Sequence, residues 1–356
     1  MSKPRIAVVL FNLGGPDRPE AVRPFLYNLF SDPAIIGLPA PLRLPLAYLL
    51  ARRRARAAAA IYDSLGGGSP LLPNTQAQAR AIEAALADMG EVRCFVAMRY
   101  WHPMSEECAL QVREFDPAEI VLLPLYPQFS TTTTASSLRV WHRAAKLAGI
   151  DRPTRVVCCY PSEDGLIEAQ AKLIRDHYDR AGRHGRPRIL FSAHGLPKKV
   201  VERGDPYQWQ CERTNEAIVA RLRADGLDPD WVGCYQSRVG PLEWIGPSTD
   251  AEILRAGRDG VPVVVVPTAF VSEHSETLVE IEEEYRHLAA ANGVPWFERV
   301  PAVGVEPGFI GGLARLVRAA LASGAASGAA GGCALRSEAG GRICPGRLGG
   351  CPQVAA

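Results

Sequence analysis

A histidine at the end of an apolar segment is the first residue whose type and position could do chemistry. His194 directly follows the run 188–193, which has the composition of a buried strand, and Gly195 and Pro197 form a tight turn after it. An imidazole with an ordinary pKa of about 6.5 exchanges protons near neutral pH. A lone strand-end histidine is more often structural than catalytic, so its neighbours must decide its role.

A row of glutamates follows another apolar run, 263–268. Its members are three or four residues apart, which predicts one acidic face of a helix. The positions are Glu273, Glu276, Glu280, and Glu283 or Glu284. A solvated face with Ser272 as the N-cap would explain such a row. A helix that starts at the carboxyl end of a core strand instead favours carboxylates that conduct protons or guide a cation.

Imidazole and carboxylate together suit a divalent first-row metal such as Fe(II). The chain has no HxxxH or CxxC array for permanent capture, so transient metal handling is favoured. The glycine-rich segments 12–16 and 64–70 complete neither a GxGxxG nor a Walker pattern, and no GxSxG elbow occurs. A nucleotide-dependent oxidoreductase is therefore a weaker interpretation than metal chemistry.

Short β-branched or aromatic runs alternate with amphipathic helical stretches, a pattern typical of parallel βαβ architecture. Eight strands are expected, near 5–12, 93–98, 119–125, 154–160, 188–193, 231–236, 262–268 and 296–300. The two halves of this set resemble each other, since 121–133 is similar to 263–277. The prediction is an α/β fold of two similar Rossmann-like domains, each with a four-stranded parallel sheet flanked by helices. Ligands of such sheets bind beyond the carboxyl ends of the strands, so a cleft between the domains is expected.

Three segments follow from this division: an N-terminal domain over 1–160, a C-terminal domain over 161–321, and an extension over 322–356. The extension is rich in Gly and Ala like a linker, but it contains Cys333, Cys344 and Cys351. The first half is longer than the second mainly because of 34–69, an apolar, proline-rich stretch followed by arginines. This stretch is either a surface helical hairpin or a lip over the cleft, apolar toward a flat ligand and basic toward carboxylates or anionic lipid.

Composition restricts the partners and the compartment. A formal net charge of +2 gives no global field for nucleic acid. Nine cysteines, an odd number, fit a reduced cytoplasmic protein better than a disulfide scaffold. The apolar stretch 6–13 ends in a glycine turn without a cleavage site, and prolines interrupt 34–50, so neither a signal peptide nor a membrane span is expected. The sequence gives no oligomeric state.

Eight segments in order match one family closely. They are NLGGP (12–16), YDSLGGGSP (62–70), MRYWHP (98–103), LYPQFSTTTTASS (125–137), FSAHGLP (191–197), RGDPY (203–207), YQSRVGPLEWIGP (235–247) and SEHSETLVEIEEEY (272–285). Over about 5–320 the chain resembles ferrochelatase, the terminal enzyme of haem synthesis. The resemblance implies two Rossmann-like domains with a porphyrin cleft, and insertion of Fe(II) into protoporphyrin IX with release of two protons.

The resemblance also implies roles for particular residues. The essential histidine of the family falls on His194 and its metal-side glutamate on Glu276, while Glu280 continues the acidic row. Either His194 or Glu276 would hold iron first, and the two glutamates would relay protons or strip water from the ion. The porphyrin-contacting positions fall on Leu13, Arg54, Tyr62, Ser69, Arg99, Tyr100, Tyr126 and Trp244. Leu13 stands where some members have methionine.

Some members of the family carry a [2Fe-2S] cluster held by four cysteines, three of them in a C-terminal extension. The resemblance implies such a cluster on Cys333, Cys344 and Cys351. Thr131 occupies the usual position of the fourth ligand, so Cys158 or its neighbour Cys159 would supply it.

Two other functions remain open on the residues. One is a chelatase of the same fold that loads cobalt or acts on coproporphyrin. The other is a porphyrin or haem carrier without catalysis, which would need neither a proton acceptor nor a cation path. The expected location is the cytoplasm, with peripheral contact to the inner face of the membrane through the lip.

Overall fold

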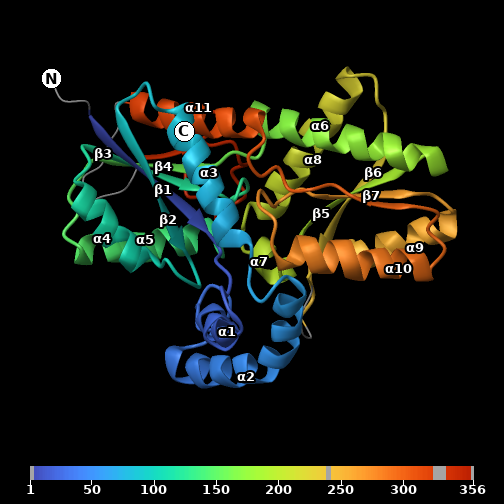
Figure 1. Ribbon diagram of the computed structural model, residues 1–356, viewed down its shortest axis with the longest axis horizontal. Helices are drawn as coiled ribbons and strands as arrows, with labels where there is room; N and C mark the ends of the chain where they lie inside the picture. The colour runs from blue at the N-terminus through green and yellow to red at the C-terminus, as the bar shows by residue number, and fades with distance from the viewer. Residues whose placement is uncertain (1–3, 238–241, 324–333, 354–356) are drawn as a thin grey trace. The chain divides into compact units, whose positions relative to one another are not determined.

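A computed structural model describes residues 4–237, 242–323 and 334–353 of the 356-residue chain. The chain divides into two compact units, described separately below (Figure 1). The first unit comprises Met1–Cys158 and Ala314–Gly341, and the second comprises Cys159–Leu313 and Arg342–Ala356. Helix α11 (Pro307–Ala322) begins in the second unit and ends in the first.

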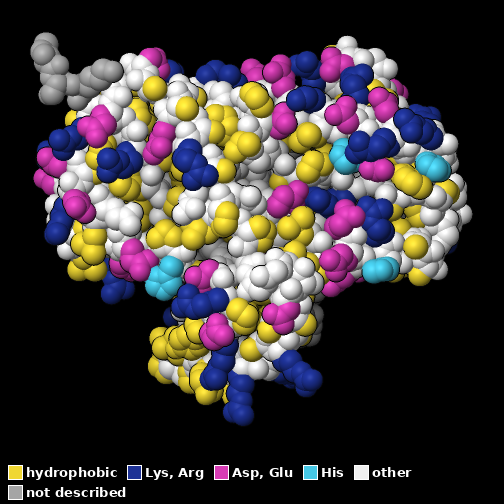
Figure 2. All heavy atoms as spheres, viewed as in Figure 1, with side chains coloured by type: hydrophobic (Ala, Val, Ile, Leu, Met, Phe, Trp, Pro, Cys, Tyr) yellow, Lys and Arg dark blue, Asp and Glu magenta, His cyan; other side chains and the backbone are white. Residues whose placement is uncertain are grey.

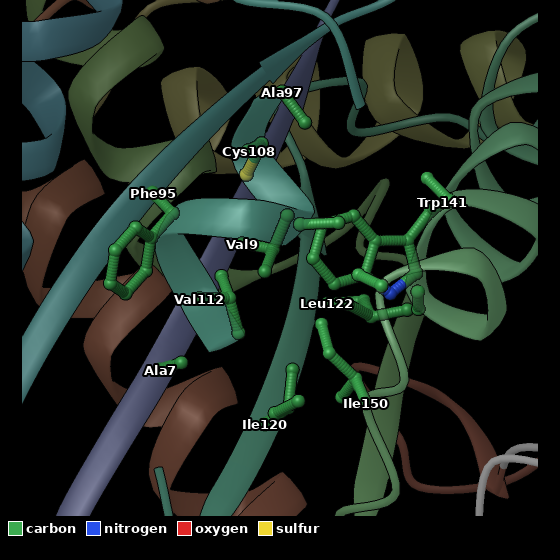
Figure 3. Close-up of a cluster of buried hydrophobic side chains, with 14 of the residues drawn as sticks. Ala7, Val9, Phe95, Ala97, Cys108, Val112, Ile120, Leu122, Trp141 and Ile150 are labelled. Carbon is green, nitrogen blue, oxygen red and sulfur yellow. The ribbon is translucent and has the colours of Figure 1, made fainter. Parts of the chain in front are cut away.

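The first unit is built on a five-stranded sheet in the order β2-β1-β3-β4-β9. Its strands are β1 (Arg5–Asn12), β2 (Glu91–Met98), β3 (Glu119–Pro124), β4 (Thr154–Cys159) and β9 (Ala334–Ser337). The pairs β1–β2, β1–β3 and β3–β4 are parallel. Helices α3 (Leu71–Ala85), α4 (Ser105–Phe115) and α5 (Thr134–Leu147) pack with this sheet. The core between β1, β3, α4 and α5 contains Val9, Leu122, Val112 and Trp141, as Figure 3 shows.

The second unit is built on a four-stranded parallel sheet in the order β6-β5-β7-β8. Its strands are β5 (Arg188–His194), β6 (Asp230–Gln236), β7 (Val263–Pro267) and β8 (Phe297–Arg299). Successive side chains of β5 face opposite sides, as strand geometry requires. Phe191 packs with α6 (Asp164–Ala181) and α8 (Tyr207–Ala224) on one side. Leu190 packs on the other side with α9 (Thr249–Asp259) and the π-helix η3 (Glu276–Tyr285).

Short helices complete the two units. They are η1 (Pro19–Ala21), α1 (Val22–Phe30), η2 (Gly182–His184), α7 (Lys198–Glu202) and α10 (Arg286–Ala291). Helix α10 continues directly from η3.

The predicted α/β class and all eight predicted strands are confirmed. The prediction of four strands in the first sheet was wrong, because β9 from the Gly/Ala-rich tail is a fifth strand beside β4. Leu335 packs against the core of the first unit, and Ser337 is buried. Apolar contact and strand pairing therefore order a segment that its composition made look like a linker.

The stretch 34–69 contains one long helix, α2 (Ala40–Ser64), which packs against α1. Prolines start this helix, where the missing N–H costs nothing, and Pro45 lies inside it. Only Ala47, Ala51 and Tyr62 of α2 are buried. Six large apolar side chains of this region are exposed: Ile35, Leu38, Leu42, Leu44, Tyr48 and Leu49. Figure 2 shows hydrophobic and basic side chains gathered over α1 and α2.

No helix in the described part of the chain combines the length and apolar character needed to cross a bilayer.

Candidate active site

Three neighbouring strands of the second unit bring polar side chains to one edge of their sheet. His194 is the last residue of β5, and it pairs in register with Gln236, the last residue of β6. Strand β7 lies on the other side of β5, and Glu276 opens η3 a few residues after that strand ends. Because carboxyl ends of parallel strands share an edge, residues 82 positions apart in the chain meet here.

His194 and Glu276 form a hydrogen-bonded pair. The distance from His194 Nδ1 to Glu276 Oε2 is 3.0 Å, and the two side chains are 39% and 27% exposed. A carboxylate accepts, so Nδ1 of the neutral ring carries the hydrogen and Nε2 keeps a free lone pair. The pair thus has the arrangement of an oriented general base, with the carboxylate fixing the tautomer.

The charges of the pair stabilise each other. Burial would raise the pKa of Glu276, but the charge and hydrogen bond of His194 outweigh it and lower that pKa to about 2. Burial alone would lower the pKa of His194, whereas the charge and hydrogen bond of Glu276 raise it above its ordinary value. Protonation of His194 is therefore favoured by a carboxylate that remains ionised.

Glu280 is the next carboxylate of η3 and is held by several donors. Its Oε2 accepts hydrogen bonds from Gln236 Nε2 at 3.0 Å and the Ser237 hydroxyl at 2.5 Å. Its Oε1 accepts from the Ser237 backbone N–H at 2.9 Å and the Tyr285 hydroxyl at 3.1 Å. Burial and the charge of Glu276 raise the pKa of Glu280, against the lowering effect of Ser237 and Gln236.

The predicted acidic face differs from the observed one. Residues 276–285 form a π-helix, and Ser275 rather than Ser272 precedes it. Glu273 lies before the helix, where it accepts hydrogen bonds from Arg299 Nη1 at 2.8 Å and the Ala302 N–H at 3.0 Å. The predictions that Glu273 belongs to the row and that Ser272 caps the helix were therefore wrong, since an arginine of β8 binds Glu273 and the helix begins later.

The end of the row is solvated. Glu283 and Glu284 are exposed, so the solvated-face interpretation holds for that part of η3.

His274, which precedes η3, is buried and accepts a hydrogen bond on Nδ1 from the Thr277 N–H at 3.3 Å. Burial lowers the pKa of His274 despite the opposing charges of Glu276 and Glu273. His274 was not singled out from the sequence, and only its position two residues before Glu276 indicates that it lies near the site.

Comparison with known proteins gives the family. A family model described as Ferrochelatase matches residues 5–321. The chain belongs to the ferrochelatase family. It is 55% identical over 350 residues to the ferrochelatase of Caulobacter vibrioides, covering 97% of this chain and 98% of that one. It is 57% identical over 320 residues to the ferrochelatase of Phenylobacterium zucineum, covering 89% and 92% of the two chains. Membership of the ferrochelatase family makes the chain a metal chelatase of haem synthesis, a lyase.

Solved chelatases share the fold. SirB from Bacillus subtilis with Fe3+ aligns with a TM-score of 0.53 and 11% identity, over 90% of this chain and 96% of that one. The sirohydrochlorin chelatase SirB from Bacillus subtilis subspecies spizizenii, in complex with cobalt, gives a TM-score of 0.50 and 12% identity over 88% and 94%. At these identities the likeness concerns the fold alone.

Two residues that the ferrochelatase resemblance points to, Arg99 and Tyr100, are bound by an internal carboxylate of the first unit. Asp32 accepts hydrogen bonds from Arg99 Nη2 at 2.6 Å and from the Tyr100 hydroxyl at 2.8 Å. Ser136 donates a third at 2.6 Å. Tyr100 is 1% exposed, and the side chain of Arg99 is 16% exposed. No local pattern in the sequence indicates Asp32 as their partner.

The other predicted porphyrin positions have varied surroundings. In the first unit, Leu13 and the buried Tyr62 belong to the apolar cluster around α1 and α2, and Arg54 is exposed on α2. Ser69 donates its backbone N–H to Pro16 at 2.7 Å, and Tyr126 is half-buried against the core. In the second unit, Trp244 forms an antiparallel bridge with Pro197, in the turn after His194.

The tail cysteines are partly described. Cys344 and Cys351 are buried, and Gln210 Nε2 donates to Cys344 Sγ at 3.1 Å. A hydrogen bond from Cys344 is the main reason why the pKa of Cys351 falls to about 6. Cys158 is buried in β4, and Cys333 lies outside the described residues. Within 4–237, 242–323 and 334–353 no group of three or more His, Cys, Asp or Glu side chains is arranged to hold a metal ion.

Proposed function

We propose that this chain inserts Fe(II) into protoporphyrin IX to form protohaem, with His194 as the proton acceptor. The observation that carries the proposal is the 3.0 Å pair of His194 Nδ1 and Glu276 Oε2 at the carboxyl edge of the second sheet. The ferrochelatase relatives give the reaction class. The pair supplies what that reaction needs, which is a base that works near neutral pH.

The proton chemistry follows from the tautomer. A free porphyrin carries two inner N–H groups, and both protons must leave before the four nitrogens bind a divalent ion. Nε2 of His194 accepts a pyrrole proton, and the ionised Glu276 stabilises the imidazolium that forms. The stabilisation exists only after transfer, so it lowers the barrier rather than strengthening substrate binding.

A difference in acidity then directs the proton onward. The pKa of Glu276 is lowered to about 2, and that of Glu280 is raised. Of the two carboxylates, Glu280 is therefore the better acceptor for a proton that leaves His194, and that departure resets His194 for the second pyrrole proton. The alternative role of these carboxylates, to strip water from iron, uses the same two positions and fits the same geometry.

Iron is handled transiently in this proposal. His194 and Glu276 offer one nitrogen and one carboxylate, a donor pair that suits Fe(II) without closing a coordination shell. An ion held by two protein ligands exchanges readily with a tetradentate macrocycle. Fe(II) is a substrate of the proposed reaction, and either member of the pair would touch it first.

The test is an oxygen-free assay of Fe(II) with protoporphyrin IX, followed by the absorbance of haem. His194→Ala should lower turnover by about 10²-fold or more while porphyrin still binds, because the base is lost and the binding surface is not. His184→Ala is a matched control, since His184 stacks on Trp296 at 4.0 Å outside this pair. Near-normal turnover of the His194 variant would refute the role.

The same assay separates the alternatives. Paired metals and porphyrins identify a cobalt or coproporphyrin chelatase by the product that forms fastest. A carrier would bind porphyrin without any metallation. The arrangement of His194, Glu276 and Glu280 argues against a carrier, because such a protein needs no proton acceptor.

Substrate contacts are proposed separately for each unit. In the first unit we assign them to Leu13, Arg54, Tyr62, Ser69, Arg99, Tyr100 and Tyr126. In the second unit Trp244 is assigned, beside the turn that follows His194. Arg99 and Tyr100 expose little side-chain surface, because both are hydrogen-bonded to Asp32. They would therefore act mainly by fixing the shape of the substrate-binding surface of the first unit.

The tail is proposed to hold a [2Fe-2S] cluster through Cys333, Cys344 and Cys351, with Cys158 or Cys159 as the fourth thiolate. Two features support the fit. Cys344 and Cys351 are hydrogen-bonded neighbours, and β9, which starts one residue after Cys333, lies beside the strand that carries Cys158. Bound there, the cluster would supply one-electron redox chemistry and a covalent tie for the tail.

The loop of Cys344 and Cys351 is preorganised by an arginine. The guanidinium of Arg342 donates to the backbone carbonyls of Cys344, Pro345, Leu348 and Gln353 at 2.9–3.0 Å. A loop held in this way keeps its thiols in place before a cluster arrives. Iron and sulfide analysis of the protein purified without oxygen tests the cluster, and a colourless protein without either element would refute it.

We also propose a cytoplasmic location with peripheral contact to an anionic membrane surface. The exposed apolar side chains around α2 would enter the headgroup region, and Arg52, Arg53, Arg54 and Arg56, all exposed, would face anionic lipid. A membrane location would place the enzyme beside a poorly soluble porphyrin.

A further inference from the structure

We propose that Gln236 is a positioning residue of the site, whose side-chain amide fixes where Glu280 stands relative to the His194–Glu276 pair. The proposal rests on the proposed roles of those three residues, and it gives Gln236 a part in the reaction that the proton chemistry above does not assign. Gln236 is the last residue of β6 and is 1% exposed. A side-chain amide donates and accepts hydrogen bonds but does not titrate, so its contribution is orientation.

The backbone of Gln236 holds the turn that follows His194. The two residues are partners in the register of β5 and β6. The Gln236 carbonyl also accepts a hydrogen bond from the Gly195 N–H at 2.9 Å. The side chain of Gln236 therefore starts from a strand end that is fixed against the residue carrying the imidazole.

The side-chain amide reaches two residues of η3. Its Nε2 donates to Glu280 Oε2 at 3.0 Å and to the backbone carbonyl of Glu276 at 3.3 Å. The –NH2 group has two hydrogens, so each acceptor receives one. Because β6 is in register with His194, this group sets the spacing between the imidazole and the second carboxylate of the row.

A buried hydroxyl fixes the direction in which the amide faces. Ser192 Oγ donates to Gln236 Oε1 at 2.7 Å, and it lies 2.8 Å from Oγ1 of Thr249, the first residue of α9. Ser192 and Thr249 are both fully buried. The reverse orientation would bring the amide oxygen against the Glu280 carboxylate, two acceptors without a hydrogen between them. Ser192 of β5 thus acts on Glu280 through the amide.

The charge state of Glu280 depends on these donors. Burial and the charge of Glu276 raise the pKa of Glu280, whereas the hydrogen bonds from Ser237 and Gln236 lower it. The titratable groups that face this carboxylate are Glu276, His194 and Tyr285. Loss of the Gln236 donor alone should therefore raise the pKa of Glu280 further. Entry of water should instead lower it toward its ordinary value of 4.5.

The test removes the amide and keeps the length of the side chain. Gln236→Met has a similar volume without a strong donor or acceptor, and Glu280 keeps its hydrogen bonds from Ser237 and Tyr285. Glutamate carboxyls are titrated by NMR in labelled protein, and a Glu280→Gln sample assigns the signal. The Glu280 midpoint should move to higher pH, and kcat should fall about tenfold at constant KM for porphyrin.

Ser192→Ala tests the same chain of contacts with a smaller change. The amide keeps its donors but loses the bond that fixes its orientation, so the Glu280 midpoint should move in the same direction by less. Combined with Gln236→Met, Ser192→Ala should add nothing to the fall in kcat, because Ser192 acts on the carboxylate through the amide. If Gln236→Met fails to fold, Ser192→Ala alone still gives the direction of the shift.

Gln170→Met is the matched control. Gln170 is a buried glutamine on α6 of the same unit, and its Nε2 donates to the backbone carbonyl of Thr268 at 3.4 Å. The substitution is the same and the side chain contacts no member of the acidic row. The Glu280 midpoint and kcat should both stay constant in this variant.

The direction of the shift separates positioning from packing. A Glu280 midpoint that stays in place, or that falls toward 4.5 because water enters the site, would overturn the proposal. A kcat of Gln236→Met equal to that of the unchanged protein would overturn it as well. The titration needs no turnover. An unchanged protein that forms no haem would therefore overturn the proposed function, whereas the NMR midpoint decides separately whether Gln236 positions Glu280.

Discussion

Replacing Glu276 by Gln should lower the pKa of His194 by about one unit. The structure supplies the magnitude. Burial opposes the fall, yet the pKa of Glu276 still drops from 4.5 to about 2 beside His194, which at 1.36 kcal/mol per unit is a net stabilisation of the carboxylate of about 3 kcal/mol. The His194 side chain is 39% exposed, so solvent screening reduces this to about 1–2 kcal/mol. Because the interaction between the two side chains is reciprocal, Glu276→Gln removes the same stabilisation from the protonated ring of His194.

The assay is a pH titration of His194 by NMR in histidine-labelled protein. The chain has seven histidines, and a His194→Gln sample assigns the signal. In Glu276→Gln the midpoint should move to lower pH, and the acid limb of the kcat profile should move with it, because the neutral ring is the active base. Glu298→Gln is a useful control, since Glu298 pairs with a different histidine, His177, at 2.9 Å. A His194 midpoint that stays in place would refute the charge-pair interpretation of the site.

The His194–Glu276 pair also makes the stability of the second unit depend on pH. The pKa of His194 is raised in the folded state, so its contribution is complete below its ordinary value of about 6.5 and is lost as pH rises through the folded value. The pKa of Glu276 is depressed, so its contribution is present above 4.5 and is lost as pH falls toward about 2. The pair therefore stabilises the second unit most between about pH 4.5 and 6.5.

Two further predictions concern the first unit. Asp32→Asn should lower the free energy of unfolding of the first unit by about 3 kcal/mol, because Arg99 loses a buried ion pair. Hydrogen exchange of the β1 and β3 amides measures the loss. Asp116→Asn, at an exposed ion pair, should have little effect. Protection as strong as in the unchanged protein would contradict it. Leu42→Ser with Leu49→Ser should weaken sedimentation with anionic vesicles about tenfold, whereas Leu147→Ser, at a more exposed leucine on another helix, should not. If the unchanged protein, the double variant and Leu147→Ser all bind the vesicles equally, α2 is not the membrane contact.

Much of the fold could be predicted because apolar runs of strand length are local signals. The eight runs lie where the eight strands form, and their alternation with helices indicates parallel sheets. The ninth strand was missed because β9 has only four residues in a Gly/Ala-rich tail, and it is stabilised by its neighbour β4 and by packing of Leu335. A segment whose structure depends on a distant partner carries little local signal.

The sequence by itself determined the α/β class, the strand-end position of His194, and Glu276 and Glu280 as carboxylates after the third strand of the second unit. Local periodicity could not distinguish an α-helix from the π-helix of 276–285, because both have regular polar spacing. Nor could it show that Arg299 binds Glu273, that Asp32 binds Arg99, or that the Tyr285 hydroxyl donates to Glu280. Those outcomes are ion pairs and hydrogen bonds between different elements, which form only when the tertiary structure brings their partners within about 3 Å.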